Sequence, residues 1–268
     1  MGRLGANPSA PLVASRRSRQ EKPPWREMPA IENPVETEFL RPVLLGESIL
    51  PYRVFRPFEG VIPVTQNGHV FDAEGAANRG FEGLSGWLRK AEAAWEKHRS
   101  SPDSLIENLN HYGKLASQFP IATVRTVYAK AGTLPAACIV RDRRTVIDHK
   151  LYWMAPSNEN EANYLAAILN SETGRARVAQ FQSRGQWGAR DFDKVMFNLP
   201  IPRFDPARSL HSDLATAGAR AERAAALVEL PENVRFQRAR AMIRTALTEA
   251  GIAQTIDGLV TDLLDGAS

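Results

Sequence analysis

ATVRTVYAKAGTLPAACIVRDRRTVIDHKLYWMA, residues 122–155, is the β-rich part of the chain. Three runs in it, residues 122–130, 135–142 and 145–155, are rich in β-branched and aromatic side chains, which favour strands. Residues that favour turns separate the runs, among them Gly132 and Asp142. The stretch therefore predicts a three-stranded meander.

Helical patterns flank this stretch. An apolar stripe predicts a helix over residues 81–98, and a basic helix is expected over 172–182. Asn158, three residues before Glu161, is typical of a helix N-cap. From residue 209 onward, small and apolar side chains recur at helical spacing and permit close helix packing. We therefore expect an α+β fold, a small mixed or antiparallel sheet with flanking helices and a C-terminal helical arm.

The N-terminal region has a different character. Residues 1–34 are rich in Pro, Arg and Ser and show no period, which predicts an extended basic arm with little structure of its own. FLRPVLLG, residues 39–46, is predicted to be a helical turn broken at Pro42 and Gly46. The expected organisation is an arm over 1–34, an α/β lobe over 35–208 and a helical segment over 209–268.

Composition limits the class of protein. The 268 residues are 43% hydrophobic and 24% charged, as in ordinary globular proteins. No apolar run approaches the roughly 20 residues of a membrane span, and the first residues lack the order of a signal peptide. We therefore expect a cytoplasmic protein with no membrane partner. One cysteine, Cys138, cannot form an intramolecular disulfide bond.

Charge is segregated along the chain. Residues 110–150 carry seven Lys and Arg against two Asp, a net charge of +5, whereas residues 31–109 carry a net charge of −4. Residues 1–30 and 171–208 are also positive, at +4 and +3. Blocks of positive charge in a nearly neutral protein indicate a face that binds a polyanion. For any single cation, a solvated surface position is the alternative.

Most catalytic motifs are missing. The sequence has no glycine-rich phosphate loop, GxSxG, HExxH or CxxC pattern, and its five histidines lack metal-ligand spacing. Lys22-Pro23-Pro24-Trp25 resembles the Asn/Asp/Ser-Pro-Pro-aromatic loop of amino-methyltransferases, which must accept hydrogen bonds from the target amine. Lysine only donates hydrogen bonds, so we interpret this segment as a rigid extended arm.

Asp148-His149-Lys150 suggests one enzymatic alternative. On a strand, Asp148 and Lys150 would project from one face, as in metal-dependent nucleases where a carboxylate binds Mg²⁺ and a lysine steadies the attacking water. Such a site needs a second carboxylate, and Asp142 falls in a turn. The pattern is also compatible with a strand face that is solvated or contacts phosphate.

Residues 183–190 form a glycine-bracketed loop that displays Arg184, Gln186, Trp187 and Arg190. Arg and Gln make bidentate contacts with guanine and adenine edges, and Trp can stack or wedge between bases. The loop is therefore a candidate for reading DNA. A surface turn anchored by a half-buried Trp187 explains the same residues equally well.

The order of several segments resembles a known family. These segments are residues 128–133, 136–140, 146–153, 163–171, 182–185, 190–194 and 199–204. Together they look like the target-recognition region of the large N6-adenine DNA methyltransferases of type I-like and type IIG-like restriction-modification systems. The likeness spans about residues 12–228, and its most specific part is the pair YLAAILNS, residues 164–171, and LPIP, residues 199–202.

The resemblance implies a function. In that family the region is an α/β lobe that reads bases in the major groove, and helices brace it against the methyltransferase lobe. The family's methyl-donor and Asn-Pro-Pro-aromatic motifs normally lie upstream and are absent from these residues. We therefore expect a truncated or split product that does not methylate DNA alone. No cofactor is expected in this chain, and S-adenosylmethionine would bind a missing or separate catalytic domain.

The expected partners are double-stranded DNA and, as a second candidate, a separate methyltransferase catalytic chain. Besides the nuclease, a structural module that docks to such a chain through the helices after Leu210 stays open as an alternative. The resemblance and the charges together predict two roles. Phosphates are positioned by Arg16, Arg17, Lys114, Arg125, Lys130 and Lys150, and base edges are approached by Arg184, Gln186, Trp187 and Arg190.

Overall fold

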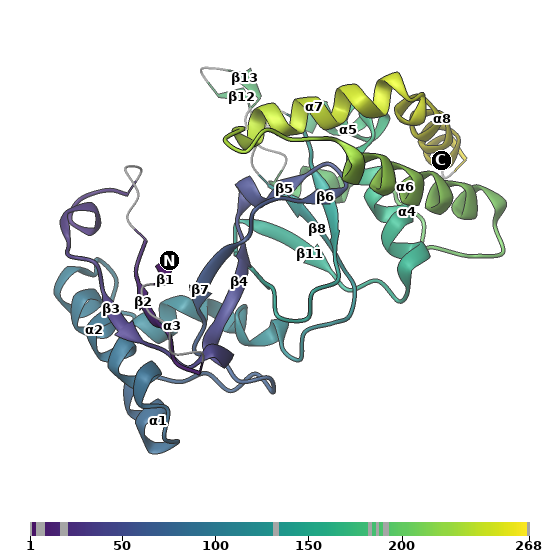
Figure 1. The fold of residues 1–268 in the computed structure, drawn as a ribbon. Coiled ribbons are helices and arrows are strands. Elements are labelled where there is room, and N and C mark those ends of the chain that lie inside the picture. The colour runs from purple at the N-terminus through teal and green to yellow at the C-terminus, as the bar shows by residue number, and fades with distance from the viewer. Residues whose placement is uncertain are drawn as a thin grey trace. The chain divides into compact units, whose positions relative to one another are not determined.

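The structure is a computed structural model of the chain and describes residues 2–3, 9–16, 21–130, 134–181, 184–185, 188–189 and 193–266. The fold is α+β, as predicted, with small sheets and several helices (Figure 1). The chain divides into two compact units. Unit 1 comprises residues 1–43, 58–122 and 144–146, and unit 2 comprises residues 44–57, 123–143 and 147–268. The boundaries at residues 34 and 208 stay predictions.

The first sheet of unit 1 is antiparallel, with the order β1-β2-β3. Val13, in the middle of β2, is fully buried with Phe39 and Leu84. The prediction that residues 1–34 have little structure of their own is therefore wrong. The strands pair across many intervening residues, which no local pattern reports. The strands are β1 (Gly2–Arg3), β2 (Leu12–Ala14) and β3 (Glu32–Pro34).

A second sheet has the order β10-β4-β7. Its central strand, β4, covers most of the segment predicted to be a helical turn, and that prediction is wrong. Pro42 lacks an N–H group and suggested a break, but β4 pairs antiparallel with β7, with Leu40 opposite Val61. Tertiary pairing outweighs the local signal. The strands are β4 (Leu40–Leu44), β7 (Phe58–Val61) and β10 (Val146–Ile147).

The helices of unit 1 cover a core of their own. The helix predicted over residues 81–98 is confirmed as α2 (Glu82–His98), and it buries Leu84 and Leu88. Asp72 caps the preceding helix by accepting a hydrogen bond from the Gly75 backbone N–H at 2.7 Å. The other helices are α1 (Ala73–Asn78) and α3 (Leu105–Leu109), with 3-10 helices η1 (Trp25–Glu27), η2 (Thr37–Phe39), η4 (His111–Gly113) and η5 (Ala116–Gln118).

The main sheet of unit 2 is antiparallel, with the order β11-β8-β9. The third strand therefore pairs with the first, and the predicted meander order is wrong. The predicted strand over residues 145–155 is also divided, because its beginning belongs to the sheet of β4. The strands are β8 (Arg125–Ala129), β9 (Ala137–Val140) and β11 (Leu151–Met154).

A turn at Asp148 divides that predicted strand. The Asp148 carboxylate accepts a hydrogen bond from the Lys150 N–H at 2.9 Å. The backbone carbonyl oxygen of Asp148 accepts one from the Leu151 N–H at 2.9 Å. Side-chain hydrogen bonds of this kind let aspartate compete with a strand ladder. The chain therefore leaves one sheet before the turn and enters another after it.

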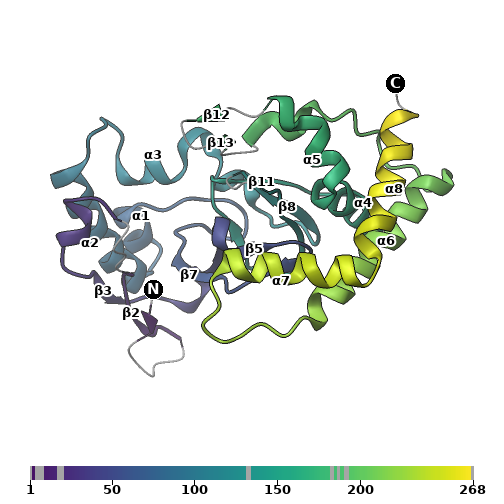
Figure 2. The same cartoon turned by 90° about the horizontal axis from the view of Figure 1, so that it is seen from above.

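Helices pack against the sheet of unit 2. Asn158 accepts a hydrogen bond from the Glu161 N–H at 2.9 Å, which confirms the predicted N-cap. Figures 1 and 2 both show α6 beside α4. In the part of the chain that the structure describes, none of the helices has the length and apolar character needed to cross a membrane. The helices are α4 (Glu159–Asn170), α5 (Glu172–Val178), α6 (Ser209–Leu227), α7 (Phe236–Glu249) and α8 (Ile252–Asp265).

Short elements complete unit 2. Two small antiparallel pairs, β5 with β6 and β12 with β13, lie outside the main sheet. The strands are β5 (Ile49–Leu50), β6 (Arg53–Val54), β12 (Arg184–Gly185) and β13 (Gly188–Ala189), and the 3-10 helices are η3 (Gly46–Ser48), η6 (Ala179–Phe181) and η7 (Asp193–Asn198).

Gly218 lets α6 approach α4 closely. A Cβ atom at this position would lie 2.3 Å from the backbone oxygen of Asn163. We expect Gly218→Ala to lower the free energy of unfolding by about 2 kcal/mol, because the helices would have to separate. Urea denaturation followed by circular dichroism measures the change.

Gly258→Ala is the matched control, because Gly258 lies in α8 and a Cβ atom there would meet nothing within 4 Å. The better helix propensity of alanine should raise the stability by up to about 1 kcal/mol. Equal effects of the two substitutions would contradict the close-packing argument.

Candidate nucleic-acid interface

Two of the lysines that are predicted to contact phosphate lie at the same end of the main sheet of unit 2. Lys130 directly follows β8 and Lys150 directly precedes β11, and these two strands pair antiparallel. The register places Ala129 opposite Leu151 and Tyr128 opposite Tyr152, so Lys130 and Lys150 lie at the same sheet end. We call Lys130, His149, Lys150 and Tyr152 the lysine end.

The Lys130 ammonium group is held in a defined position. Its Nζ donates a hydrogen bond to the His149 carbonyl oxygen at 2.7 Å and lies 4.1 Å from the centre of the Tyr152 ring. The Lys150 side chain is exposed, and Asp148 contacts the exposed His149 ring at 3.3 Å. An ammonium group has three donors, and a lysine pair at a strand end is suited to contacting phosphate oxygens.

The same turn changes the geometry expected for the nuclease alternative. Asp148 and Lys150 belong to a turn and do not project from a common strand face, so that expectation is wrong. The Asp148 carboxylate accepts the Lys150 backbone N–H. Within the described ranges, no three His, Cys, Asp or Glu side chains come together in a way that could hold a metal ion.

One predicted phosphate contact is wrong. Arg125 is 0% exposed, and its guanidinium group donates to the Asp142 carbonyl oxygen at 3.2 Å. Burial lowers the pKa of this guanidinium to about 10. The β-branched pattern of the strand predicted the backbone correctly but could not show that the arginine points into the protein.

Other predicted residues lie elsewhere. Arg16 and Lys114 are exposed in unit 1, and the Arg16 guanidinium lies 4.4 Å from the centre of the Phe58 ring. Arg184 pairs with Ala189 across the two short strands β12 and β13, and its side chain is not described. Arg17, Gln186, Trp187 and Arg190 lie outside the described residues.

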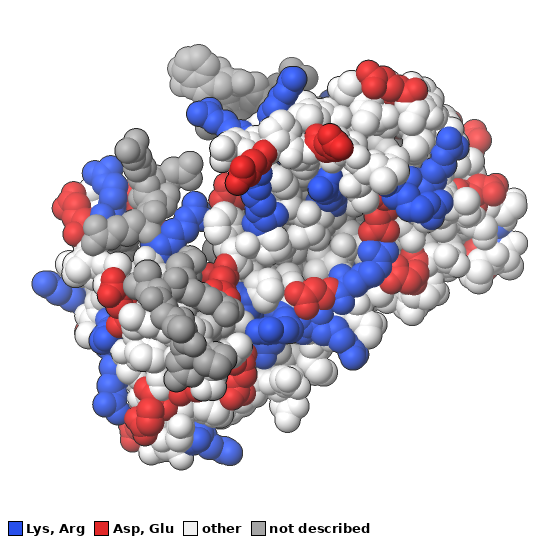
Figure 3. All heavy atoms as spheres, viewed as in Figure 1, with Lys and Arg blue, Asp and Glu red and all other residues white. Residues whose placement is uncertain are grey.

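Arg141, for which no role was predicted from the sequence, forms two ion pairs. It binds Glu159 at 2.8 Å and Glu222 at 2.7 Å, and hydrogen bonds to these two carboxylates raise its pKa. Arg141 directly follows β9, and its two partners belong to α4 and α6. Figure 3 likewise shows Lys and Arg interspersed with Asp and Glu on the face drawn. Surface cations must therefore be separated into those that hold the fold and those available for a ligand.

The Pro-Pro-Trp segment of unit 1 contributes to packing. Trp25 stacks on Trp95 with ring centres 5.7 Å apart and contacts the His98 ring at 5.9 Å. Both partners belong to α2. The aromatic ring is therefore used within the protein.

The two most specific segments of the family resemblance contact each other. Tyr164, from YLAAILNS, donates its hydroxyl hydrogen to the Pro202 carbonyl oxygen of LPIP at 3.0 Å. The Tyr164 ring also packs 5.5 Å from the Phe204 ring and 5.0 Å from the His211 ring. These segments form the scaffold of unit 2.

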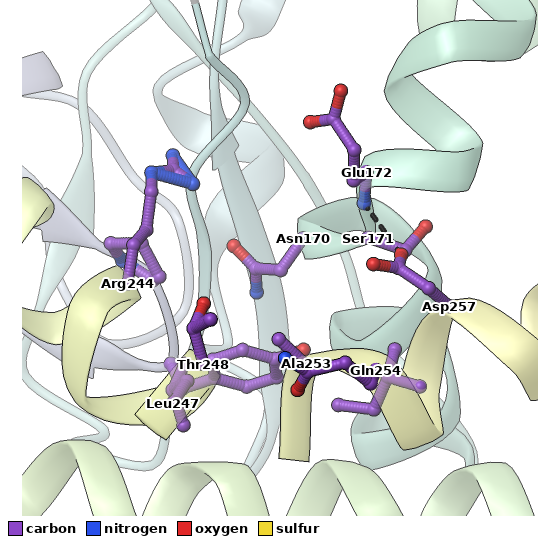
Figure 4. Close-up of a pocket in the computed structure, with 12 residues that line it drawn as sticks. Asn170, Ser171, Glu172, Arg244, Leu247, Thr248, Ala253, Gln254 and Asp257 are labelled. Atoms are coloured by element: carbon purple, nitrogen blue, oxygen red, sulfur yellow. Dashed lines mark hydrogen bonds between the residues drawn. The ribbon is translucent and has the colours of Figure 1, made fainter. Parts of the chain in front are cut away.

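A cavity of about 340 Å³ lies among α5, α7 and α8 (Figure 4). Asp257 caps α5 by accepting the Glu172 N–H at 2.8 Å and the Thr173 N–H at 3.1 Å. Arg244 donates to the Pro135 carbonyl oxygen, and Asn170 binds the Ala137 N–H and carbonyl groups at 2.9 Å. Polar groups around the cavity thus connect secondary-structure elements, and its walls carry both signs of charge.

Comparisons with known proteins give a likeness of fold. No family model matches the sequence, and no curated protein matches it. Among solved structures, the type IIL restriction-modification enzyme MmeI in complex with DNA matches with a TM-score of 0.55 and 13% identity, over 86% of this chain and 28% of that chain. The type IIG restriction endonuclease BpuSI matches with a TM-score of 0.37 and 13% identity, over 97% of this chain and 31% of that chain. The chain thus spans less than a third of either enzyme chain, and its fold is similar to part of a restriction-modification enzyme.

His211 makes the scaffold sensitive to pH. Its ring is fully buried, and Nδ1 accepts the Asp205 N–H at 2.9 Å. Burial lowers its pKa, and the nearby Arg208 lowers it further. The unfolded chain therefore binds this proton first as the pH falls, so the stabilising contribution is present above about pH 6.5 and is lost below it.

We expect His211→Asn to weaken this pH dependence, because the asparagine oxygen can accept the same hydrogen bond without titrating. The measurement compares the free energies of unfolding of both proteins at about pH 7.5 and about pH 5.5. The loss on acidification should be smaller in the variant. An identical loss in both proteins would assign it to other groups.

Proposed function

We propose that these 268 residues are the target-recognition portion of a site-specific adenine DNA methyltransferase of a restriction-modification system. The observation that carries the proposal is the fold similarity, over 86% of this chain, to part of an enzyme whose structure contains DNA. The order of the segments that resemble the adenine methyltransferase family supports it separately, because this order is a property of the sequence and does not depend on the fold similarity.

The lysine end supports polyanion binding. Lys130 and Lys150 come from segments that are separated in the sequence, yet the pairing of β8 with β11 brings them to one sheet end. A lysine there can contact a phosphate, because an ammonium group offers several donors in a compact charge. Hydrogen bonds to phosphate supply affinity and orientation without sequence information.

Sequence reading is proposed to reside in the segment that contains β12 and β13. Arginine and glutamine side chains can bind base edges bidentately in the major groove. Arg125 is left out of the proposed phosphate contacts because it is buried, so these are Arg16, Arg17, Lys114, Lys130 and Lys150. The proposed base contacts are Arg184, Gln186, Trp187 and Arg190.

Methyl transfer is assigned to a catalytic domain outside these 268 residues. Their sequence has no glycine-rich donor loop, and Lys22 stands where the methyltransferase loop has a hydrogen-bond acceptor. The chain's own contribution is therefore to bind and orient the DNA. A separate methyltransferase chain and cytoplasmic location are parts of the same proposal.

DNA binding should depend on salt through the lysine end. We expect the purified chain to bind random-sequence duplex DNA, with an affinity that falls linearly on a logarithmic salt scale. Lys130→Gln and Lys150→Gln should each weaken binding to all sequences alike and reduce the slope by about one unit. Fluorescence anisotropy at several salt concentrations measures both quantities.

Arg175→Gln is the control, because Glu172 accepts hydrogen bonds from the Arg175 guanidinium at 2.8 Å. Its salt slope should equal that of the wild type. Absence of binding at low salt would contradict the proposal, and Mg²⁺-dependent nicking abolished by Lys150→Ala would replace it with the nuclease.

Arg184→Ala should affect specificity instead. After a preferred sequence is selected from a random pool, we expect the variant to lose about 1–3 kcal/mol on that sequence and much less on others. Arg177→Ala is the control, because Arg177 pairs with Asp265. Equal losses of Arg184→Ala on all sequences would make Arg184 a phosphate contact.

A further inference from the structure

The Tyr112 ring is exposed to solvent, and its backbone conformation is unusual. It lies in η4 of unit 1, and 86% of its surface is exposed. Its φ angle is 53°, in the left-handed region that side chains other than Gly, Asn and Asp seldom adopt. A large aromatic side chain is thus displayed at a strained position, and strained positions concentrate at functional sites.

The loop around Tyr112 is held by internal hydrogen bonds. The Asn110 side-chain oxygen accepts the Ala116 N–H at 2.9 Å, and the Asn110 carbonyl oxygen accepts the Gly113 N–H at 2.7 Å. Leu115, directly after the loop, is buried in a cluster with Phe119. The ring is therefore presented by a defined frame that is anchored in the core of unit 1.

Positive charge accompanies the ring. The Lys114 ammonium nitrogen lies 5.8 Å from the centre of the Tyr112 ring, and the His111 ring lies 4.2 Å from it. Both neighbours are exposed. Glu107, a nearby acid in the sequence, accepts the Ser104 N–H at 2.7 Å and caps α3. An exposed aromatic ring beside a cation complements a nucleic acid, whose bases stack on aromatic rings while its phosphates attract cations.

We propose that Tyr112 is a base-stacking residue, which inserts its ring where two DNA bases have lost their stacking, while Lys114 contacts a neighbouring phosphate. This inference rests on the proposed function and goes beyond it, because it gives unit 1 a contact with the bases. A stacking wedge binds best where the unstacking has already occurred, since opening an intact step costs free energy.

The test compares an intact duplex with the same duplex carrying a single-nucleotide gap, so no target sequence is needed. The full chain should bind the gapped duplex about tenfold more tightly, as the stacking of one base allows. Tyr112→Ala should bring the ratio of the two dissociation constants close to one, and Tyr112→Trp should preserve it. Lys114→Gln should weaken both complexes and leave the ratio unchanged.

Leu227→Ala is the matched control, because Leu227 is a similarly exposed apolar residue at 83%, in unit 2. Its ratio should equal that of the wild type. Binding without a preference for the gap, or a preference that Tyr112→Ala retains, would overturn the inference and leave the proposed function intact. Failure to bind either duplex at low salt would overturn both.

Discussion

The close approach of α6 to α4 at Gly218 is the constraint on which unit 2 depends. The absence of a Cβ atom lets the α6 backbone contact the Asn163 carbonyl of α4. From its other end, α4 binds the β9 backbone at Ala137 through Asn170. β9 pairs with β8, which ends just before Lys130. The packing of the two helices is thus connected to the proposed phosphate contact Lys130 through the Asn170 amide and the pairing of β9 with β8.

The positive block over residues 110–150 divides into two sets once the fold is known. Arg125 is buried against a backbone carbonyl, and Arg141, directly after β9, binds carboxylates of α4 and α6, so both stabilise the fold. Lys130 and Lys150 lie at a sheet end, where Lys150 is exposed and Lys130 donates to the His149 carbonyl oxygen. Net charge alone therefore overstates the binding surface. Local charge indicates a partner only after the cations used in packing have been removed from the count.

Features with local signals were predicted correctly. Asn158 and Glu161 mark the start of α4 because a cap is a contact between near neighbours, and the small stripe of α6 includes Gly218. The strand order and β4 could not be predicted, because each depends on partners that are distant in the sequence. The prediction that Arg125 contacts phosphate was wrong for a related reason. Alternation predicts the two faces of a strand, but both faces of β8 are buried, so period two contains no information about exposure.

The most specific part of the family resemblance lies in the scaffold of unit 2. Tyr164 is buried and binds Pro202, whereas Lys150 and Tyr112 lie on exposed turns where substitution leaves the cores intact. Buried segments tolerate few changes because their hydrogen bonds and packing are mutually dependent, while loops on a rigid scaffold can vary. Related chains should therefore share the contact between YLAAILNS and LPIP, and exposed turns on this scaffold should vary more.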